Sequence, residues 1–234
     1  MASIVATVKN AEKLVERTMK GNDASHDAAH VWRVRDLALS LAQEEGLSSD
    51  SMEIVELAAL LHDIGDYKYL RDPSEEKIVE NFLEEEGVDE VKKMKILAII
   101  KGMGAFLFSG FKEELAGHAN GEFSPEFRVV QDADRLDAIG AVGIARCFTF
   151  GGSRNRLLHD PAIHPRSDLS KAQYMKKEEQ TTVNHFHEKL LKLKDMMKTK
   201  QWSAIDSHDF LDAFLGAIPG IRGYSFKTAY SVVG

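Results

Sequence analysis

The chain of 234 residues has few of the features that define several whole classes of proteins. It contains one cysteine, Cys147, so it cannot form an internal disulfide and is not a disulfide-stabilised scaffold. It contains no apolar run of the roughly 18 residues that a membrane helix needs. Basic residues number 30 against 37 acidic ones, and the net charge of −7 argues against a broad basic surface for duplex nucleic acid. We therefore expect a cytoplasmic protein without a membrane or duplex nucleic acid as partner.

The composition that remains is that of a globular protein with a substantial core. Hydrophobic residues make up 44% of the chain and charged residues 29%, which excludes disorder as a description of the whole. The first twenty residues resemble a weak targeting peptide, but Glu12 and Glu16 interrupt that composition. We expect a packed first helix there, because apolar residues recur at helical spacing. They are Val5, Val8, Ala11, Leu14 and Val15.

Helical periodicity dominates the rest of the chain, and no alternation typical of strands persists. Gly46 follows one apolar stripe as a stop signal, and Ser49 or Asp50 is a candidate N-cap for the next. Two stretches read as irregular: residues 101–124, rich in glycine and phenylalanine, and residues 151–170. The sequence therefore predicts an all-α fold. The expected helices span residues 30–45, 48–61, 73–83, 88–100 and 171–199.

Three polar clusters carry the residues that could perform chemistry. In the first, His26, His30 and Arg33 are spaced to share one helix face. The second is His62-Asp63, at the end of a strongly apolar helix and three residues before Asp66. The third contains four charged residues ahead of a run of small ones. They are Asp132, Asp134, Arg135 and Asp137.

A divalent cation explains the second cluster best. Placing His62 and Asp63 at the inner end of so apolar a helix is costly unless something binds them. A set of histidine and carboxylate ligands suits Mn²⁺, Fe²⁺, Co²⁺ or Mg²⁺ with open water positions. A water on such an ion becomes a nucleophile near neutral pH, and the ion polarises a phosphoryl oxygen. The sequence thus favours one divalent metal ion as cofactor.

Together the blocks resemble the HD-domain metal-dependent phosphohydrolases. The H…HD…D pattern of that superfamily matches His30, His62-Asp63 and Asp134, and residues 25–34 match the S-H-D-x-x-H-x-x-R-V opening of its bacterial and plant branch. The resemblance covers about residues 20–200. It implies an HD-domain helical bundle over residues 1–200 with a divalent-metal site in its core, followed by an atypical segment of residues 201–234.

The resemblance also implies a role for each matching residue. Asp134 is preferred as ligand over Asp132, which would support the site or cap the helix. Asp66 and Lys68 would be catalytic, Asp66 in proton transfer and Lys68 in neutralising phosphate charge. The residues expected to contact substrate are Arg33, Arg135 and His26. The implied metal ligands are His30, His62, Asp63 and Asp134.

Simpler roles compete for several of these side chains. A structural salt bridge is the alternative for Arg33, and N-terminal capping of its helix is the alternative for His26. Asp137 could orient Arg135 or a water. His185 and His187 invite a second metal site, but their spacing puts them on different helix faces, so a surface helix is favoured.

The implied activity is hydrolysis of a small phosphorylated substrate, with nucleotides as the favoured class. Either a monoester phosphatase or a triphosphate pyrophosphohydrolase fits the pattern. A non-catalytic nucleotide-binding module is the alternative. The chain departs from the family at residues 105–110, which look like an apolar insertion. Exposure of Phe106, Leu107 and Phe108 there would favour a homo-oligomer.

Overall fold

The computed structural model describes residues 4–65, 77–109, 123–166 and 180–200. Within these ranges the regular structure is helical, apart from one isolated bridge between Leu157 and Thr181. The expected all-α fold is therefore confirmed. The α-helices are α1 (Ile4–Thr18), α2 (Ala28–Glu44), α3 (Ser49–Leu61), α4 (Ile78–Glu85), α5 (Glu90–Ser109), α7 (Pro125–Asp137), α8 (Gly140–Ser153) and α10 (Thr182–Glu188). Two short 3₁₀ helices follow, η3 (Leu190–Lys192) and η4 (Lys194–Met196).

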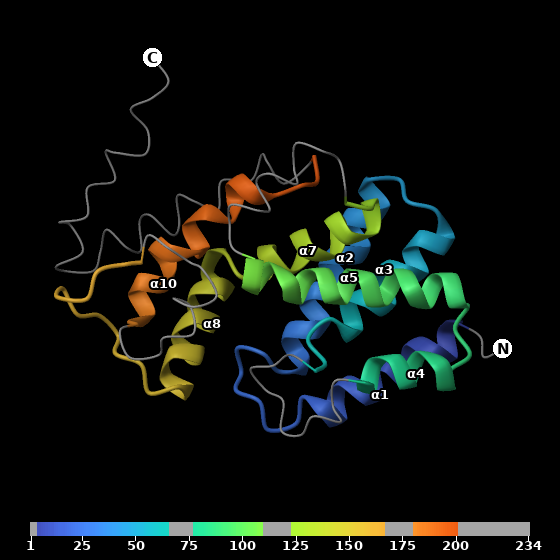
Figure 1. The fold of residues 1–234 in the computed structure, drawn as a ribbon, viewed down its shortest axis with the longest axis horizontal. Coiled ribbons are helices and arrows are strands. Elements are labelled where there is room, and N and C mark those ends of the chain that lie inside the picture. Colours follow the sequence, from blue (N-terminus) through green and yellow to red (C-terminus); the bar gives the residue numbers. More distant parts are fainter. Residues whose placement is uncertain (1–3, 66–76, 110–122, 167–179, 201–234) are drawn as a thin grey trace, which may run out of the picture.

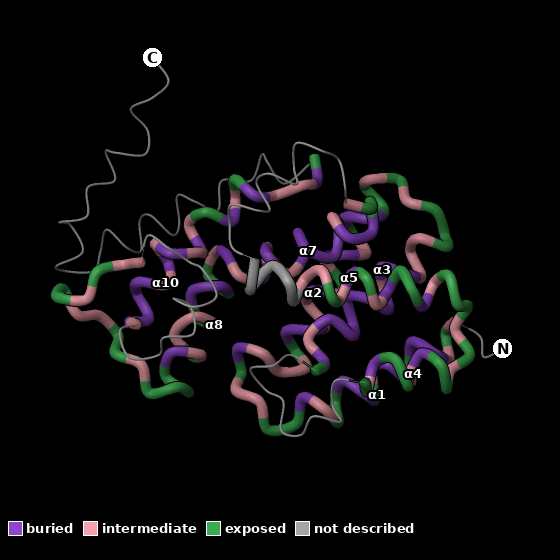
Figure 2. Tube along the Cα trace, in the orientation of Figure 1, coloured by how far each residue is buried: buried purple, intermediate pink, exposed green. Residues whose placement is uncertain are grey.

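A larger core is built around α2, which packs against both α3 and α7. Asp27 caps α2 by accepting the backbone N–H of His30, and Gly46 follows the helix with a φ of +69° that favours glycine. Ser48 caps α3, so the predicted cap at Ser49 or Asp50 was wrong by one or two residues. Figure 1 shows α1 and α4 at the end of the molecule far from α8 and α10. In Figure 2 the buried residues line the inward faces of these helices.

The first helix is packed as expected, with one exception. Val8, Ala11, Leu14 and Val15 are buried, whereas Val5 is 62% exposed. In the part of the chain that the structure describes, no helix is both long and apolar enough to cross a membrane.

The predicted loop at residues 101–124 was wrong in its first part, because α5 continues to Ser109. A Cβ on Gly102 would come within 2.6 Å of the Phe127 ring, so glycine at this position allows α5 to approach α7 closely. The glycine that read as a helix breaker thus serves a tertiary contact. Residues 110–122 lie outside the described ranges, as do the side chains behind the predicted self-association.

A second, smaller core joins α8 to α10 and the 3₁₀ helices that follow. It contains Ile139, Ile144, Val183, Phe186, Leu190 and Leu193. The single helix predicted over residues 171–199 was wrong within the described residues, where α10 ends at Glu188 and short 3₁₀ turns follow. Tertiary hydrogen bonds hold this irregular path: Arg166 binds Glu188, and Arg135 donates to the Met196 carbonyl. Residues 201–234 lie outside the described ranges.

Candidate metal centre

His30 lies on the first turn of α2, which Asp27 caps. The side chain is only 1% exposed. Its Nδ1 lies 2.7 Å from an oxygen of Asp137, at the far end of α7. Because a carboxylate accepts, Nδ1 carries the proton of this hydrogen bond, and Nε2 faces the interior of the site without a hydrogen-bond partner.

His62 and Asp63 follow the last turn of α3, where the apolar sequence has filled the core with leucine and alanine. His62 Nδ1 donates to the carbonyl of Ala59 at 2.7 Å, which leaves Nε2 as the bare nitrogen. Asp63 places one oxygen 3.4 Å from His62 Nε2 and the other 3.3 Å from His30 Nε2. His62 and Asp63, although consecutive in the chain, thus direct a ring nitrogen and a carboxylate toward the Nε2 of His30.

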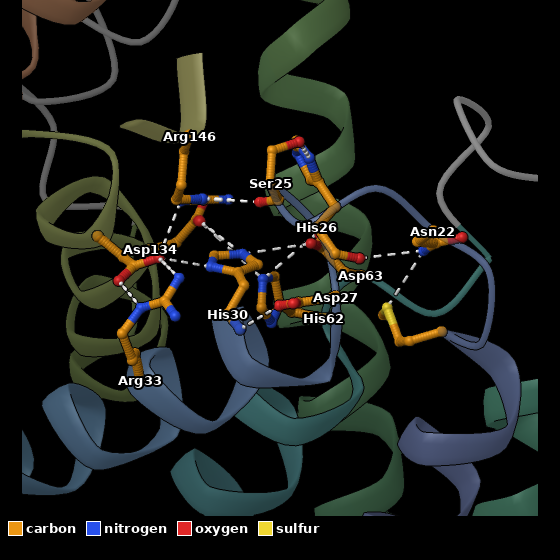
Figure 3. Close-up of polar contacts among 12 residues, drawn as sticks. Asn22, Ser25, His26, Asp27, His30, Arg33, His62, Asp63, Asp134 and Arg146 are labelled. Atoms are coloured by element: carbon orange, nitrogen blue, oxygen red, sulfur yellow. Dashed lines mark hydrogen bonds and ion pairs between the residues drawn. The ribbon is translucent and has the colours of Figure 1, made fainter. Parts of the chain in front are cut away.

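Asp134 completes the cluster from the last turns of α7. Its Oδ1 lies 3.5 Å from His30 Nε2 and 4.0 Å from His62 Nε2. The ligand atoms of His30, His62 and Asp134 all lie within 4.8 Å of one another. Figure 3 shows these side chains converging from three different helices. The Asp134 side chain is 38% exposed, so the cluster opens to solvent on this side.

These residues fit a divalent cation. His30 Nε2, His62 Nε2 and Asp63 Oδ2 are buried and have no hydrogen-bond partner. Leaving several polar atoms buried in this way costs about 1–3 kcal/mol each, unless a ligand satisfies them. Imidazole nitrogens and carboxylate oxygens are ligands for Mn²⁺, Fe²⁺, Co²⁺ and Zn²⁺, and the set alone does not select one ion.

The charge of the cluster also favours a cation. Burial would raise the pKa of Asp63, but the charges of His62 and His30 outweigh it and hold that pKa well below its ordinary value. The pKa of Asp134 is lowered in the same way, against the effects of burial and of Asp63. Positive charge on the two histidines therefore keeps both carboxylates ionised, and a bound cation would supply that charge when each Nε2 is bare.

Asp137 pairs with Arg33 and Arg146 in the described part of the chain, rather than with Arg135, which was one of the two partners considered for it. Its carboxylate accepts from His30 and, at 2.6 and 3.0 Å, from Nε and Nη2 of Arg33. Arg146 on α8 adds a second cation, with its Nη1 3.0 Å from the carboxylate. Although burial alone would raise the pKa of Asp137, these contacts lower it to about 2.

Arg33 thus makes the salt bridge that was its alternative role. The two-pronged contact with Asp137 takes up its Nε and Nη2, while the side chain stays 38% exposed at the edge of the site. A guanidinium held in this way still presents positive charge to an anion at the opening.

Arg135 and Asp132 lie away from the cluster. Arg135 is 3% exposed and donates to the Met196 carbonyl, so its expected contact with substrate has no support in this arrangement. Asp132 is fully buried and accepts the backbone N–H groups of Lys198 and Thr199, together with the Thr199 hydroxyl. The two side chains connect η4 and the residues that follow it to α7.

His26 lies beside the centre. Its ring is 5.8 Å from that of His30 and 5.6 Å from that of Phe150 on α8, measured between centroids. Ser25 Oγ lies 2.7 Å from its Nδ1. Asp27 caps α2 itself, and in the turn before it Asp23 accepts from the backbone N–H and the hydroxyl of Ser25, as in the structural role weighed against substrate contact for this segment.

Two residues that were expected at the site lie outside the described ranges, and one residue at the site was not expected. Asp66 and Lys68 lie outside the described residues. Arg146 was not singled out by the sequence, yet its Nε donates to the Ser25 carbonyl at 2.7 Å while Nη1 reaches Asp137. The one sequence signal for it is a lone charge inside the otherwise apolar and small-residue helix α8.

A helical fold in which α2, α7 and the end of α3 bring histidines and carboxylates together is that of an HD domain. The HD domain family matches residues 27–139, and the chain belongs to that family. It is 35% identical over 225 residues to the uncharacterized protein YpgQ of Bacillus subtilis, covering 92% of this chain and 96% of YpgQ. It is also 32% identical over 161 residues to the uncharacterized protein L803 of Acanthamoeba polyphaga mimivirus, covering 61% of each chain.

Solved structures show the same fold. The crystal structure of B. subtilis YpgQ in complex with ADP superposes with a TM-score of 0.67 at 30% identity, covering 94% of this chain and 98% of that one. A Lactobacillus plantarum protein gives a TM-score of 0.73 at 32% identity over 89% of this chain and 95% of its own. An HD-superfamily hydrolase from Bacillus thuringiensis gives 0.63 at 34% identity, covering 92% and 95%.

Proposed function

We propose that this protein is a metal-dependent phosphohydrolase that acts on a small phosphorylated molecule, with nucleotides as the substrate class. The observation that carries the proposal is the convergence of buried, unpartnered ligand atoms from His30, His62 and Asp63 beside the partly exposed Asp134. Two findings on relatives support it: the similar B. thuringiensis protein is an HD-superfamily hydrolase, and the similar YpgQ was crystallised with ADP.

The proposed ligands are His30, His62, Asp63 and Asp134. A divalent ion held there would polarise a phosphoryl oxygen and acidify a coordinated water. The two histidines would keep their Nδ1 protons on Asp137 and Ala59, which leaves each Nε2 free to coordinate. The partial exposure of Asp134 gives the substrate phosphate a way in from solvent.

Charge around the opening fits an anionic substrate. Arg33 is anchored on Asp137 and remains 38% exposed, so it can neutralise phosphate charge without giving up its ion pair. The ring of His26 lies between the His30 ring and Phe150, where it can contact the substrate beyond the reacting phosphate. We retain Asp66 for proton transfer and Lys68 for charge neutralisation as proposals from the sequence.

A release assay tests the proposal directly. Nucleoside mono- and triphosphates are incubated with the purified protein and Mn²⁺, Co²⁺, Mg²⁺ or a chelator, and phosphate and pyrophosphate are measured separately. We expect metal-dependent release that His62→Ala abolishes. The matched control is His185→Ala, a half-buried histidine on α10 in the smaller core, which should leave the rate unchanged.

The product decides between the two reactions: orthophosphate from a monophosphate indicates a phosphatase, and pyrophosphate from a triphosphate indicates a pyrophosphohydrolase. Release that persists in the chelator would refute the mechanism. A protein that binds metal and nucleotide tightly without turnover would instead be the non-catalytic binding module.

A further inference from the structure

The carboxylate of Asp137 occupies an unusual position behind the metal centre. It is 4% exposed and lies at the end of α7, three residues after the ligand Asp134. It accepts three hydrogen bonds, from Nδ1 of His30 at 2.7 Å and from Nε and Nη2 of Arg33 at 2.6 and 3.0 Å, and it forms an ion pair with Nη1 of Arg146 at 3.0 Å. Helices α2, α7 and α8 therefore meet at this one group.

The contact with His30 fixes which ring nitrogen faces the site. A carboxylate on Nδ1 keeps the proton there, so the bare Nε2 points to Asp63 and Asp134, at 3.3 and 3.5 Å. His62 has the same arrangement with a neutral partner, the Ala59 carbonyl. The charged partner makes the imidazole of His30 the more electron-rich ligand of the two.

We propose that Asp137 is a positioning residue of the metal centre: held in place by Arg33 and Arg146, it fixes the ring of His30 and thereby sets the affinity for a divalent cation. The proposal rests on the proposed function only in requiring that these residues bind a metal. It assigns Asp137 no contact with metal or substrate.

The two arginines explain how a carboxylate is kept in this buried place. Arg33 grips it with two nitrogens, which fixes the plane of the carboxylate as well as its position. Arg146 approaches from α8 and at the same time donates to the Ser25 carbonyl, next to His26. Through Arg146, helix α8 of the smaller core therefore contributes to the orientation of His30, which lies on α2 of the larger core.

The test measures metal binding by the whole chain, with Mn²⁺ as the probe. The protein is stripped with a chelator and titrated with Mn²⁺ while free ion is followed by electron paramagnetic resonance. Asp137→Asn keeps the size of the side chain but loses its charge and turns an N–H group toward the arginines. We expect it to weaken Mn²⁺ binding by about 10–100-fold.

The matched control is Asp132→Asn, which removes a second buried carboxylate from the same helix without touching His30. We expect it to lower thermal stability but to leave Mn²⁺ affinity within about twofold of the wild type. The visible absorption spectrum of the Co²⁺-loaded protein is a second readout, because it reports ligand geometry. It should change in Asp137→Asn and not in Asp132→Asn.

Either of two results would overturn the proposal: unchanged Mn²⁺ affinity in Asp137→Asn, or an equal loss in both variants, which would indicate a merely structural role. If Asp137→Asn does not fold, Asp137→Glu carries the test with the same expected loss, because it keeps the charge but moves it by one methylene. Wild-type protein that binds Mn²⁺ but hydrolyses nothing would refute the proposed function and leave this proposal standing.

Discussion

Asp132 and Asp134 lie two residues apart on α7, yet the structure gives them opposite tasks. Asp132 is fully buried and holds Lys198 and Thr199 through three hydrogen bonds. Asp134 is 38% exposed and faces the rings of His30 and His62. The same substitution, aspartate to asparagine, should therefore damage stability at one position and metal binding at the other.

The expected loss of stability for Asp132→Asn follows from its contacts. An amide oxygen can still accept from the three donors, but its bonds lose the strength that a charged acceptor gives, and Arg135 at 3.7 Å loses its carboxylate in a buried setting. Breaking a buried ion pair lowers the free energy of unfolding by about 3–5 kcal/mol. Because the hydrogen bonds of residue 132 survive in the variant, we expect a loss near the lower end, about 3 kcal/mol. For a chain of this size that corresponds to a fall in Tm of about 6–12 °C.

Asp134→Asn should change the stability of the metal-free protein by about 0.5 kcal/mol or less, as substitutions at partly exposed positions usually do. It should weaken Mn²⁺ binding more than the roughly 10–100-fold loss that outer partners of a metal site produce. The assay is thermal unfolding by circular dichroism in a chelator, paired with Mn²⁺ titration. Loss of Mn²⁺ by Asp132→Asn but not by Asp134→Asn would refute the ligand assignment.

Two further predictions concern the ends of α7 and α10. Glu126, at the start of α7, has a lowered pKa: burial alone would raise it, but backbone and Ser51 hydrogen bonds outweigh burial. Its contribution to stability is thus present above the unfolded pKa and lost as pH falls through the folded one. Glu126→Gln should cost about 1 kcal/mol of unfolding free energy at pH 7, and this cost should disappear as pH falls through the folded pKa, measured by urea unfolding. Replacing His185 and His187 together with alanine should leave the Mn²⁺ stoichiometry unchanged, and the loss of one equivalent would establish a second site.

The sequence by itself determined the class of fold and the blocks that form the site. Helical periodicity comes from local geometry, so α1, α2 and α3 could be located from the spacing of apolar residues. The cost of burying His62 and Asp63 in an apolar helix is also a local property, and it pointed to a cation before any contact was known. The resemblance to the HD-domain pattern then singled out His30 and Asp134, which the structure brings together with His62.

Helix ends and breaks were less predictable, because they depend on partners distant in the chain. Gly102 belonged to a predicted loop, yet α5 continues through it, and the missing Cβ at this position leaves room for the Phe127 ring of α7. The apolar stripe after Thr182 predicted one long helix, but tertiary hydrogen bonds to Glu188 and Met196 hold a broken path. Local preference for a helix is worth tenths of a kilocalorie per residue and yields to such contacts.

Only the tertiary structure decided what the charged residues around the site do. Arg33 and Asp137 are 104 positions apart, and Arg146 reaches the Ser25 carbonyl across 121. The sequence does not distinguish an arginine that binds substrate from one that is buried against a backbone carbonyl. Arg135 was expected to bind substrate, but it is buried and donates to the Met196 carbonyl. The energy of a charge pair depends on a distance of a few ångströms through space. The number of residues between two charged side chains does not give this distance, because the folded chain brings distant residues together.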